Sequence, residues 1–198
     1  MTHTSTFKVR FKRRREGKTN YAKRLALLSS KLPRLVARKT NRYIIAQLIE
    51  YSPAGDKTMV HVTSKQLEKF GWNASKKNLP AAYLTGLIAG LRAKQQKADK
   101  AILDIGFSTP IHGSFWSAVL KGAIDGGLQI KAGETAMPSR ERIEGKHIEQ
   151  FAAKLDEKRC SEIFSCYAKK NVDVKQLSKL FNATKEKILA TKGGENQK

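Results

Sequence analysis

The motif Gly17-Lys18-Thr19 has the last three letters of a nucleotide-binding P-loop. In a P-loop, the full pattern G-x-x-x-x-G-K-[ST] follows a buried strand, and successive backbone N–H groups line the phosphates. The first glycine of that pattern would stand at position 12, which is Lys12, and apolar and basic residues alternate before it. The motif therefore does not predict an ATP site. If this basic segment binds phosphate, the phosphate belongs to a ligand other than ATP.

Residue types that carry catalysis or bind metals are sparse and scattered. The four histidines form no H-x-x-x-H pair, and no serine stands in a G-x-S-x-G elbow. Cys160 and Cys166 do not have the spacing of a metal pair, so we expect reduced thiols. A two-metal nuclease needs several carboxylates at strand ends, whereas the predicted strands supply only Glu50 and Asp104 near theirs. We expect no enzyme and no cofactor, and interpret Asp104 as a hydrogen-bonded strand-end residue. A ribonuclease-H-like, metal-dependent nuclease using Asp104 is the alternative.

Positive charge is concentrated at the amino terminus. The chain of 198 residues has 39 Lys+Arg against 17 Asp+Glu, a net charge of +22, and residues 1–42 hold 14 of the bases and one acid, Glu16. Such an excess repels itself unless a polyanion neutralises it, which indicates nucleic acid or an anionic membrane. The basic segment lacks the apolar face of a membrane-binding helix, so nucleic acid is favoured. Its low hydrophobicity and high charge predict that residues 1–18 are disordered when the chain is alone.

Three antiparallel strands in a meander are predicted after this segment. Residues 21–30 have helical spacing, and residues 34–39, 42–51 and 57–63 are strand-like, because they are rich in β-branched residues and bounded by turn residues. Thr40-Asn41 suits a tight hairpin turn, since Asn tolerates positive φ. The basic residues Arg38, Lys39 and Arg42 would gather at the tip of that hairpin.

The second half of the chain predicts helices and a crossover. Residues 64–70 open as a weak capping box at Ser64, and residues 79–97 form a long helix in which Gly86 and Gly90 permit close approach to a sheet. A strand at 101–105, a helix capped by Ser114 and a return strand at 128–130 make a βαβ crossover. The expected fold class is therefore α/β with a mixed sheet. We divide it into a basic arm (1–20), an α/β core (21–132) and a helical C-terminal extension (133–198) with helices at 139–155, 156–168 and 172–190.

The loop His112-Gly113-Ser114 is a second candidate for binding phosphate. It lies between a predicted strand and a predicted helix, where free N–H groups and the helix dipole favour an anion. Flexible Gly106 and Gly113 would let the backbone approach a phosphate. An ordinary connecting loop explains the same pattern equally well.

Several separated stretches resemble one known family: REGKTNYAKR, PRLVARKTNRYIIAQLIEY, FGW, LPAAYLTGLIAGLRA and the run from ILDIGFSTP to LKGAIDGGLQI. They are similar to the universal large-subunit ribosomal protein family that binds 5S rRNA, number eighteen of the large subunit. The match spans residues 8–155, and the length and carboxyl-terminal helices resemble the archaeal form. Residues after Cys160 match poorly, which leaves their role open.

The resemblance implies a core of ribonuclease-H-like topology without the nuclease carboxylates. It also implies a cytoplasmic protein of the large subunit that docks 5S rRNA to 23S rRNA in the central protuberance, beside another 5S-binding ribosomal protein. Besides Arg10 and Lys12 of the basic run, the RNA contacts that it implies are Arg13, Arg14, Arg15, Lys18, Thr19, Asn20, Tyr21, Arg24, Arg34, Arg38, Lys39, Thr40, Asn41, Arg42, His112 and Gly113.

Overall fold

The structure is a computed structural model that describes residues 8–168, 170 and 172–191. Its centre is a four-stranded mixed sheet in the order β3-β2-β1-β4. β1 (Arg34–Lys39), β2 (Ile44–Glu50) and β3 (Lys57–Thr63) pair antiparallel in chain order, and β4 (Ile102–Asp104) lies parallel to β1. The predicted mixed α/β class is confirmed, and the alternation of β-branched and polar residues located these strands closely.

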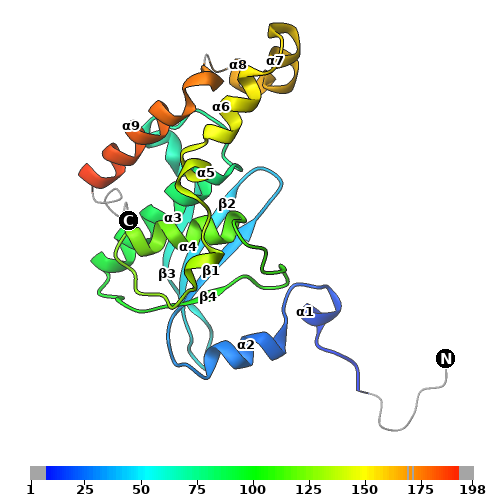
Figure 1. The fold of residues 1–198 in the computed structure, drawn as a ribbon. Coiled ribbons are helices and arrows are strands. Elements are labelled where there is room, and N and C mark those ends of the chain that lie inside the picture. The colour runs from blue at the N-terminus through cyan, green and yellow to red at the C-terminus, as the bar shows by residue number, and fades with distance from the viewer. Residues whose placement is uncertain (1–7, 169, 171, 192–198) are drawn as a thin grey trace, which may run out of the picture.

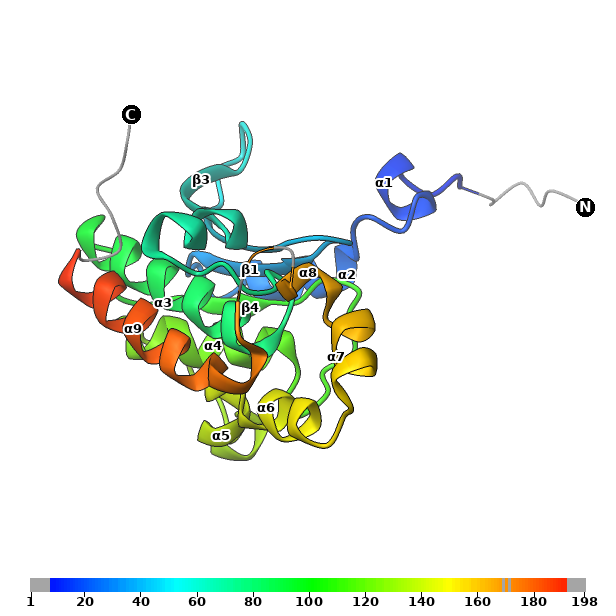
Figure 2. The ribbon, with the colours of Figure 1, turned by 90° about the horizontal axis from the view of Figure 1, so that it is seen from above.

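The two faces of the sheet differ because side chains alternate along each strand. In β2, Ile44, Ala46 and Leu48 are fully buried, whereas Ile45 and Gln47 are only partly so. We call the first side the inner face and the second the outer face. Helices cover the inner face, and the amino-terminal segment lies beyond the outer face (Figure 2).

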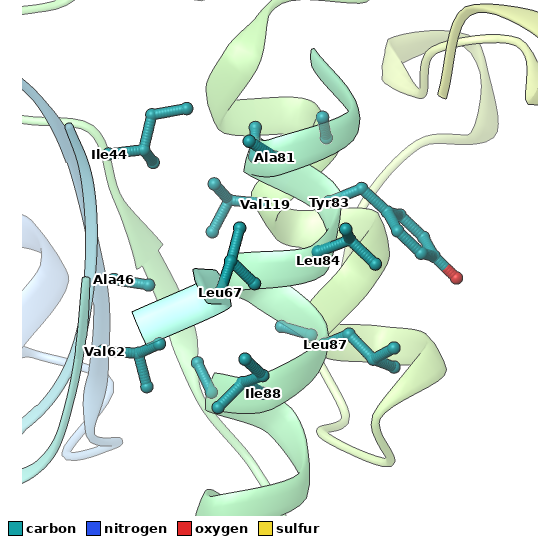
Figure 3. Close-up of a cluster of buried hydrophobic side chains, with 14 of the residues drawn as sticks. Ile44, Ala46, Val62, Leu67, Ala81, Tyr83, Leu84, Leu87, Ile88 and Val119 are labelled. Atoms are coloured by element: carbon teal, nitrogen blue, oxygen red, sulfur yellow. The ribbon is translucent and has the colours of Figure 1, made fainter. Parts of the chain in front are cut away.

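The inner face packs against α3 (Leu79–Gln95), with α4 (Phe115–Asp125) behind it. Figure 3 shows Ile44, Ala46 and Val62 pointing from the strands toward α3, on the side of the helix where Ala81 and Ile88 lie. Burying a side chain such as Leu or Ile stabilises the fold by roughly 1.5–3 kcal/mol. This apolar layer is the hydrophobic core of the protein.

The glycines of α3 and α4 let the two helices approach each other closely. A Cβ at Gly86 would lie 2.0 Å from the carbonyl oxygen of Val119, and one at Gly122 would lie 2.1 Å from that of Tyr83. Gly90 meets the same partner helix, since a Cβ there would lie 2.4 Å from a carbonyl oxygen of α4. The prediction that Gly86 and Gly90 face a sheet is therefore wrong, because both glycines of α3 face α4.

The C-terminal helices are shorter than predicted, and two of them, α5 and α9, pack against α3 (Figure 1). Gly145, with φ at +88°, ends α5 and precedes α6, so the helix predicted for 139–155 is broken there. Leu177 and Phe181 are buried in the same hydrophobic cluster as the residues of the inner face. The helices are α1 (Lys12–Arg15), α2 (Tyr21–Leu28), η1 (Ser64–Phe70), α3, α4, η2 (Glu134–Ala136), α5 (Arg140–Glu144), α6 (Lys146–Ala153), α7 (Glu157–Ile163), α8 (Ser165–Ala168), η3 (Val174–Gln176) and α9 (Leu177–Ala190).

Two local predictions are corrected by backbone hydrogen bonding. Residues 128–130 do not form a return strand, because their pairing is a single parallel bridge between Lys100 and Gln129. The parallel pair of the sheet is instead β1 with β4, which the chain reaches through α3. Ser64 is not a capping residue: its hydroxyl accepts a hydrogen bond from the N–H of Ile44 at 3.0 Å and joins η1 to the sheet.

Candidate nucleic-acid interface

The P-loop-like letters lie in a turn that closes on itself. Gly17 follows α1 with φ at +64°, a conformation that favours glycine. The backbone N–H groups of Lys18 and Thr19 both donate to the carbonyl oxygen of Arg13, at 2.8 and 3.2 Å. These donors are occupied within the arm, so the motif forms no phosphate cradle.

The described part of the arm is exposed but not structureless. All residues from 8 to 18 are exposed, yet the N–H groups of Arg14 and Arg15 donate to the carbonyl of Phe11 and start the helical turn of α1. The predicted disorder is therefore wrong for residues 12–15, while residues 1–7 lie outside the described chain. Arg14 and Arg15 form no ion pair with any residue that the structure describes, and both guanidinium groups face solvent. Arg10 and Lys12 are exposed beside them.

Three of the predicted contact residues stabilise the arm itself. The side-chain oxygen of Asn20 accepts from the N–H of Lys23 at 3.1 Å and caps α2. The hydroxyl of Thr19 accepts from Nε of Arg13 at 2.8 Å. Tyr21 packs against Phe11, with ring centroids 5.1 Å apart. These contacts fix the direction in which the arm leaves α2.

The arm and the outer face of the sheet enclose a polar cleft of about 250 Å³, which we call the arm cleft. Basic residues from the arm, from α2 and from β1 meet there, although they are distant in sequence. The cleft is lined by Arg13, Lys18, Thr19, Asn20, Lys23, Arg24, Arg34, Val36, Arg38, Gln47, Ile49, Asp56, Asp104 and Gly106.

Two carboxylates hold three of these arginines in place. Asp56 accepts from Nη2 of Arg24 through both oxygens at 2.9 Å, and from Nη2 of Arg34 at 2.6 Å. Asp104 accepts from Nη1 of Arg34 at 2.9 Å and from Nη2 of Arg38 at 3.0 Å. The five side chains form a line of alternating charge across the outer face. Arg34, in the middle, is 5% exposed, so its burial argues for a structural role rather than direct contact with RNA.

The groups around Asp104 determine the direction in which the pKa of its carboxyl shifts. Burial raises the pKa of this carboxyl, but Arg38, the backbone N–H of Gly106 at 2.8 Å and Arg34 outweigh burial, so the pKa lies below its ordinary value. Among the described residues, no group of three or more His, Cys, Asp or Glu side chains gathers where a metal could be held. The nuclease alternative is therefore not supported: the oxygens of Asp104 are used by arginines, as expected for a hydrogen-bonded strand-end residue.

Arg38 does not gather at the hairpin tip as predicted, because it lines the arm cleft, and the rest of the tip, residues 39–42, lies outside that cleft. Thr40 organises the turn, because its N–H and its hydroxyl both donate to the carbonyl of Tyr43, at 2.8 and 2.9 Å. The prediction that Asn41 has a positive φ is wrong. Lys39 lies over the ring of Phe115, 5.5 Å from its centroid. Arg42 is exposed and lines a groove of about 1110 Å³ between the tip and α6–α8.

The His112 loop is less open to an anion than its sequence indicates. The N–H of Gly113 donates to the carbonyl of Ala136 at 3.1 Å, and Nδ1 of His112 lies 3.0 Å from the carbonyl oxygen of Thr135. The prediction of a free N–H at Gly113 is therefore wrong. The space beside Gly106 is filled as well, because a Cβ there would lie 3.0 Å from the guanidinium carbon of Arg38. The imidazole of His112 remains on the surface.

Sequence reasoning missed Lys23, Gln47 and Asp56, which line the arm cleft. Lys23 lines the arm cleft, and its position on α2, three residues after the capping Asn20, was a usable signal. Gln47 lines it too and contacts Nδ1 of His61 at 3.0 Å on the outer face. The alternation of side chains along β2 and β3 predicted that Gln47 and His61 lie on the same face of the sheet. It did not indicate which face of the sheet is free of helices.

The fold and the site together define a basic α/β protein, in which a mixed sheet presents cations on the face opposite its helices. Among the described residues, no helix combines the length and apolar composition needed to cross a membrane.

Comparison with known proteins narrows this class. Residues 5–99 match the family described as ribosomal large subunit proteins 60S L5 and 50S L18. The chain is also 47% identical over 195 residues to the large ribosomal subunit protein uL18 of Korarchaeum cryptofilum (strain OPF8), an alignment that covers 98% of this chain and 100% of that protein.

The chain belongs to the uL18 family of large-subunit ribosomal proteins. The predicted resemblance and its archaeal type are confirmed, and the family places the protein in translation, in the cytoplasmic large subunit. The alignment also extends through the C-terminal helices, which the sequence motifs had left open.

Proposed function

We propose that this protein is a structural, non-catalytic constituent that binds 5S rRNA through the arm cleft and the hairpin tip. It would help to dock 5S rRNA to 23S rRNA in the central protuberance, next to another 5S-binding ribosomal protein. Family membership supports a role in the large subunit. The observation that carries the RNA surface is the meeting of Arg13, Lys18, Lys23, Arg24 and Arg38 in one cleft.

The contacts divide into two kinds. The exposed cations, Arg10, Lys12, Arg14, Arg15 and Arg42, are free to neutralise phosphates and to displace counterions. Thr19, Asn20, Arg34 and Thr40 hold the backbone and side chains that present them. Since A-form major grooves admit few side chains, discrimination would come from RNA shape, matched by the fixed separation of arm and hairpin tip.

Salt dependence tests the arm. If about eight phosphates are contacted, log K falls against log salt with a slope of roughly −6 to −7. The variant Arg13/Arg14/Arg15→Ala should bind 5S rRNA more weakly and lower the slope by about one unit per lost contact. The measurement is filter binding of 5S rRNA and of tRNA across a salt series.

A charge-matched control separates a specific arm from general attraction. Lys154/Lys158/Arg159→Ala removes the same number of charges from exposed positions near α6 and α7. It should leave the preference for 5S rRNA over tRNA unchanged. Equal losses in the two triple variants, or no loss in the arm variant, would sink the proposal.

A further inference from the structure

The two carboxylates of the arm cleft stand where a polyanion-binding surface would be expected to avoid them. Asp56 and Asp104 lie among Arg24, Arg34 and Arg38, at 2.6 to 3.0 Å. Each carboxylate cancels a charge that could attract phosphate and adds its own repulsion. Their presence therefore calls for a benefit other than net charge.

Burial of Arg34 explains one part of that benefit. Its side chain is 6% exposed and lies between the two acids, and a buried guanidinium without a partner is strongly destabilising. Asp104 itself is 7% exposed and lies at the end of β4. The pair of Arg34 with Asp104 thus belongs to the body of the fold.

Asp56 has a different place. It lies in the turn between β2 and β3, and its side chain is 23% exposed. Through Arg24 it joins this turn to α2, and α2 buries none of its own residues. Figure 1 shows α2 beside the sheet and α1 continuing from it, away from the helical layer. Because no residue of α2 is fully buried, polar contacts of this kind contribute to the orientation of the helix.

We propose that Asp56 is a positioning residue of the RNA interface: by holding Arg24 with both oxygens while Arg34 holds it from the sheet, it orients α2 and the basic arm. This inference rests on the proposed binding of 5S rRNA. Asp56 touches no RNA itself, and its effect passes through Arg24.

Positioning and simple electrostatics predict opposite signs for Asp56→Asn. Removing a negative charge from a cationic cleft should strengthen binding to any RNA, if attraction alone decides. If Asp56 positions the arm, the same substitution should weaken binding to 5S rRNA about fivefold or more, equivalent to about 1 kcal/mol. The preference over tRNA should also fall, because the cations of the cleft remain while their arrangement is lost.

The test is filter binding of the full chain to 5S rRNA and to tRNA across a salt series. Asp56→Glu, which keeps the carboxylate, should recover part of the lost affinity. Glu50→Gln removes an exposed acid from the end of the same hairpin and should bind as the wild type does or slightly more tightly. Affinity of Asp56→Asn equal to or above that of the wild type would overturn the inference.

Two further measurements keep the outcomes distinct. Trypsin should cut after Lys23 or Arg24 faster in free Asp56→Asn than in the free wild type, and unchanged cleavage would contradict an orienting role. A wild-type chain that binds 5S rRNA no better than tRNA would overturn the proposed function, whereas normal wild-type binding with an indifferent Asp56→Asn overturns only the positioning role.

Discussion

The inner and outer faces of the sheet are held by different interactions. On the inner face, Leu84 and Ile88 are fully buried, and glycines bring α3 within contact of α4. On the outer face, five charged side chains alternate in sign, and the arginines at the two ends are partly exposed. Shape complementarity fixes the first arrangement and charge pairing the second, so only the outer face should respond strongly to salt, pH and a polyanion.

The largest expected effect is steric and falls on the inner side. In Gly86→Ala the new methyl would lie 2.0 Å from the carbonyl oxygen of Val119, so α3 and α4 would have to separate. We expect the free energy of unfolding to fall by at least about 3 kcal/mol, measured by urea unfolding followed by far-UV circular dichroism. Gly133→Ala, with its nearest neighbour at 3.8 Å, is the control and should change little. Equal midpoints for the two variants would remove the contrast between the faces.

A smaller loss is expected on the outer face. Asp104→Asn removes the charge that Arg34 and Arg38 share, and should lower the free energy of unfolding by roughly 2 kcal/mol. The same urea experiment measures it, with exposed Asp99→Asn as the matched control. A neutral result for Asp104→Asn would mean that the ionic line adds nothing to stability.

The effect of pH sharpens this assignment. Because the pKa of folded Asp104 lies below its ordinary value, its contribution is complete above about pH 5 and is lost as the pH falls through the lowered value. The difference in unfolding free energy between wild type and Asp104→Asn should therefore shrink between about pH 5 and pH 3. A difference that grew toward acid would contradict the assigned direction.

The smallest effect on stability is expected in the arm. Arg14 is exposed and unpaired within the described chain, so Arg14→Ala should change the free energy of unfolding by less than about 0.5 kcal/mol. Binding of 5S rRNA should weaken in the same variant. A large loss of stability would show that the arm is part of the folded body.

The sequence alone located the strands but not the neighbours of the helices. β1, β2 and β3 were predictable, because alternating β-branched residues and turn residues are local signals. Gly86 was assigned to the wrong partner, since local sequence does not say which element covers a glycine. The helix predicted at 139–155 is too long, because a single glycine, Gly145, ends α5 and precedes α6.

The basic surface was predictable in composition but not in detail. The cluster of Arg13, Arg14 and Arg15 indicated a polyanion from charge alone. Nothing local distinguished Arg34, which is buried, from its exposed neighbours, because its partners Asp56 and Asp104 are distant in sequence. Tertiary contacts decide which cations are available.

The shortness of β4 has a consequence for the newly made chain. β4 has only three residues and is an edge strand of the sheet. Next to it, Gln129 pairs with Lys100 in an isolated bridge. Edge strands that are short or screened offer few unpaired backbone groups to a second molecule. A copy that is not yet part of a ribosome is thereby protected on this side against self-association by strand addition.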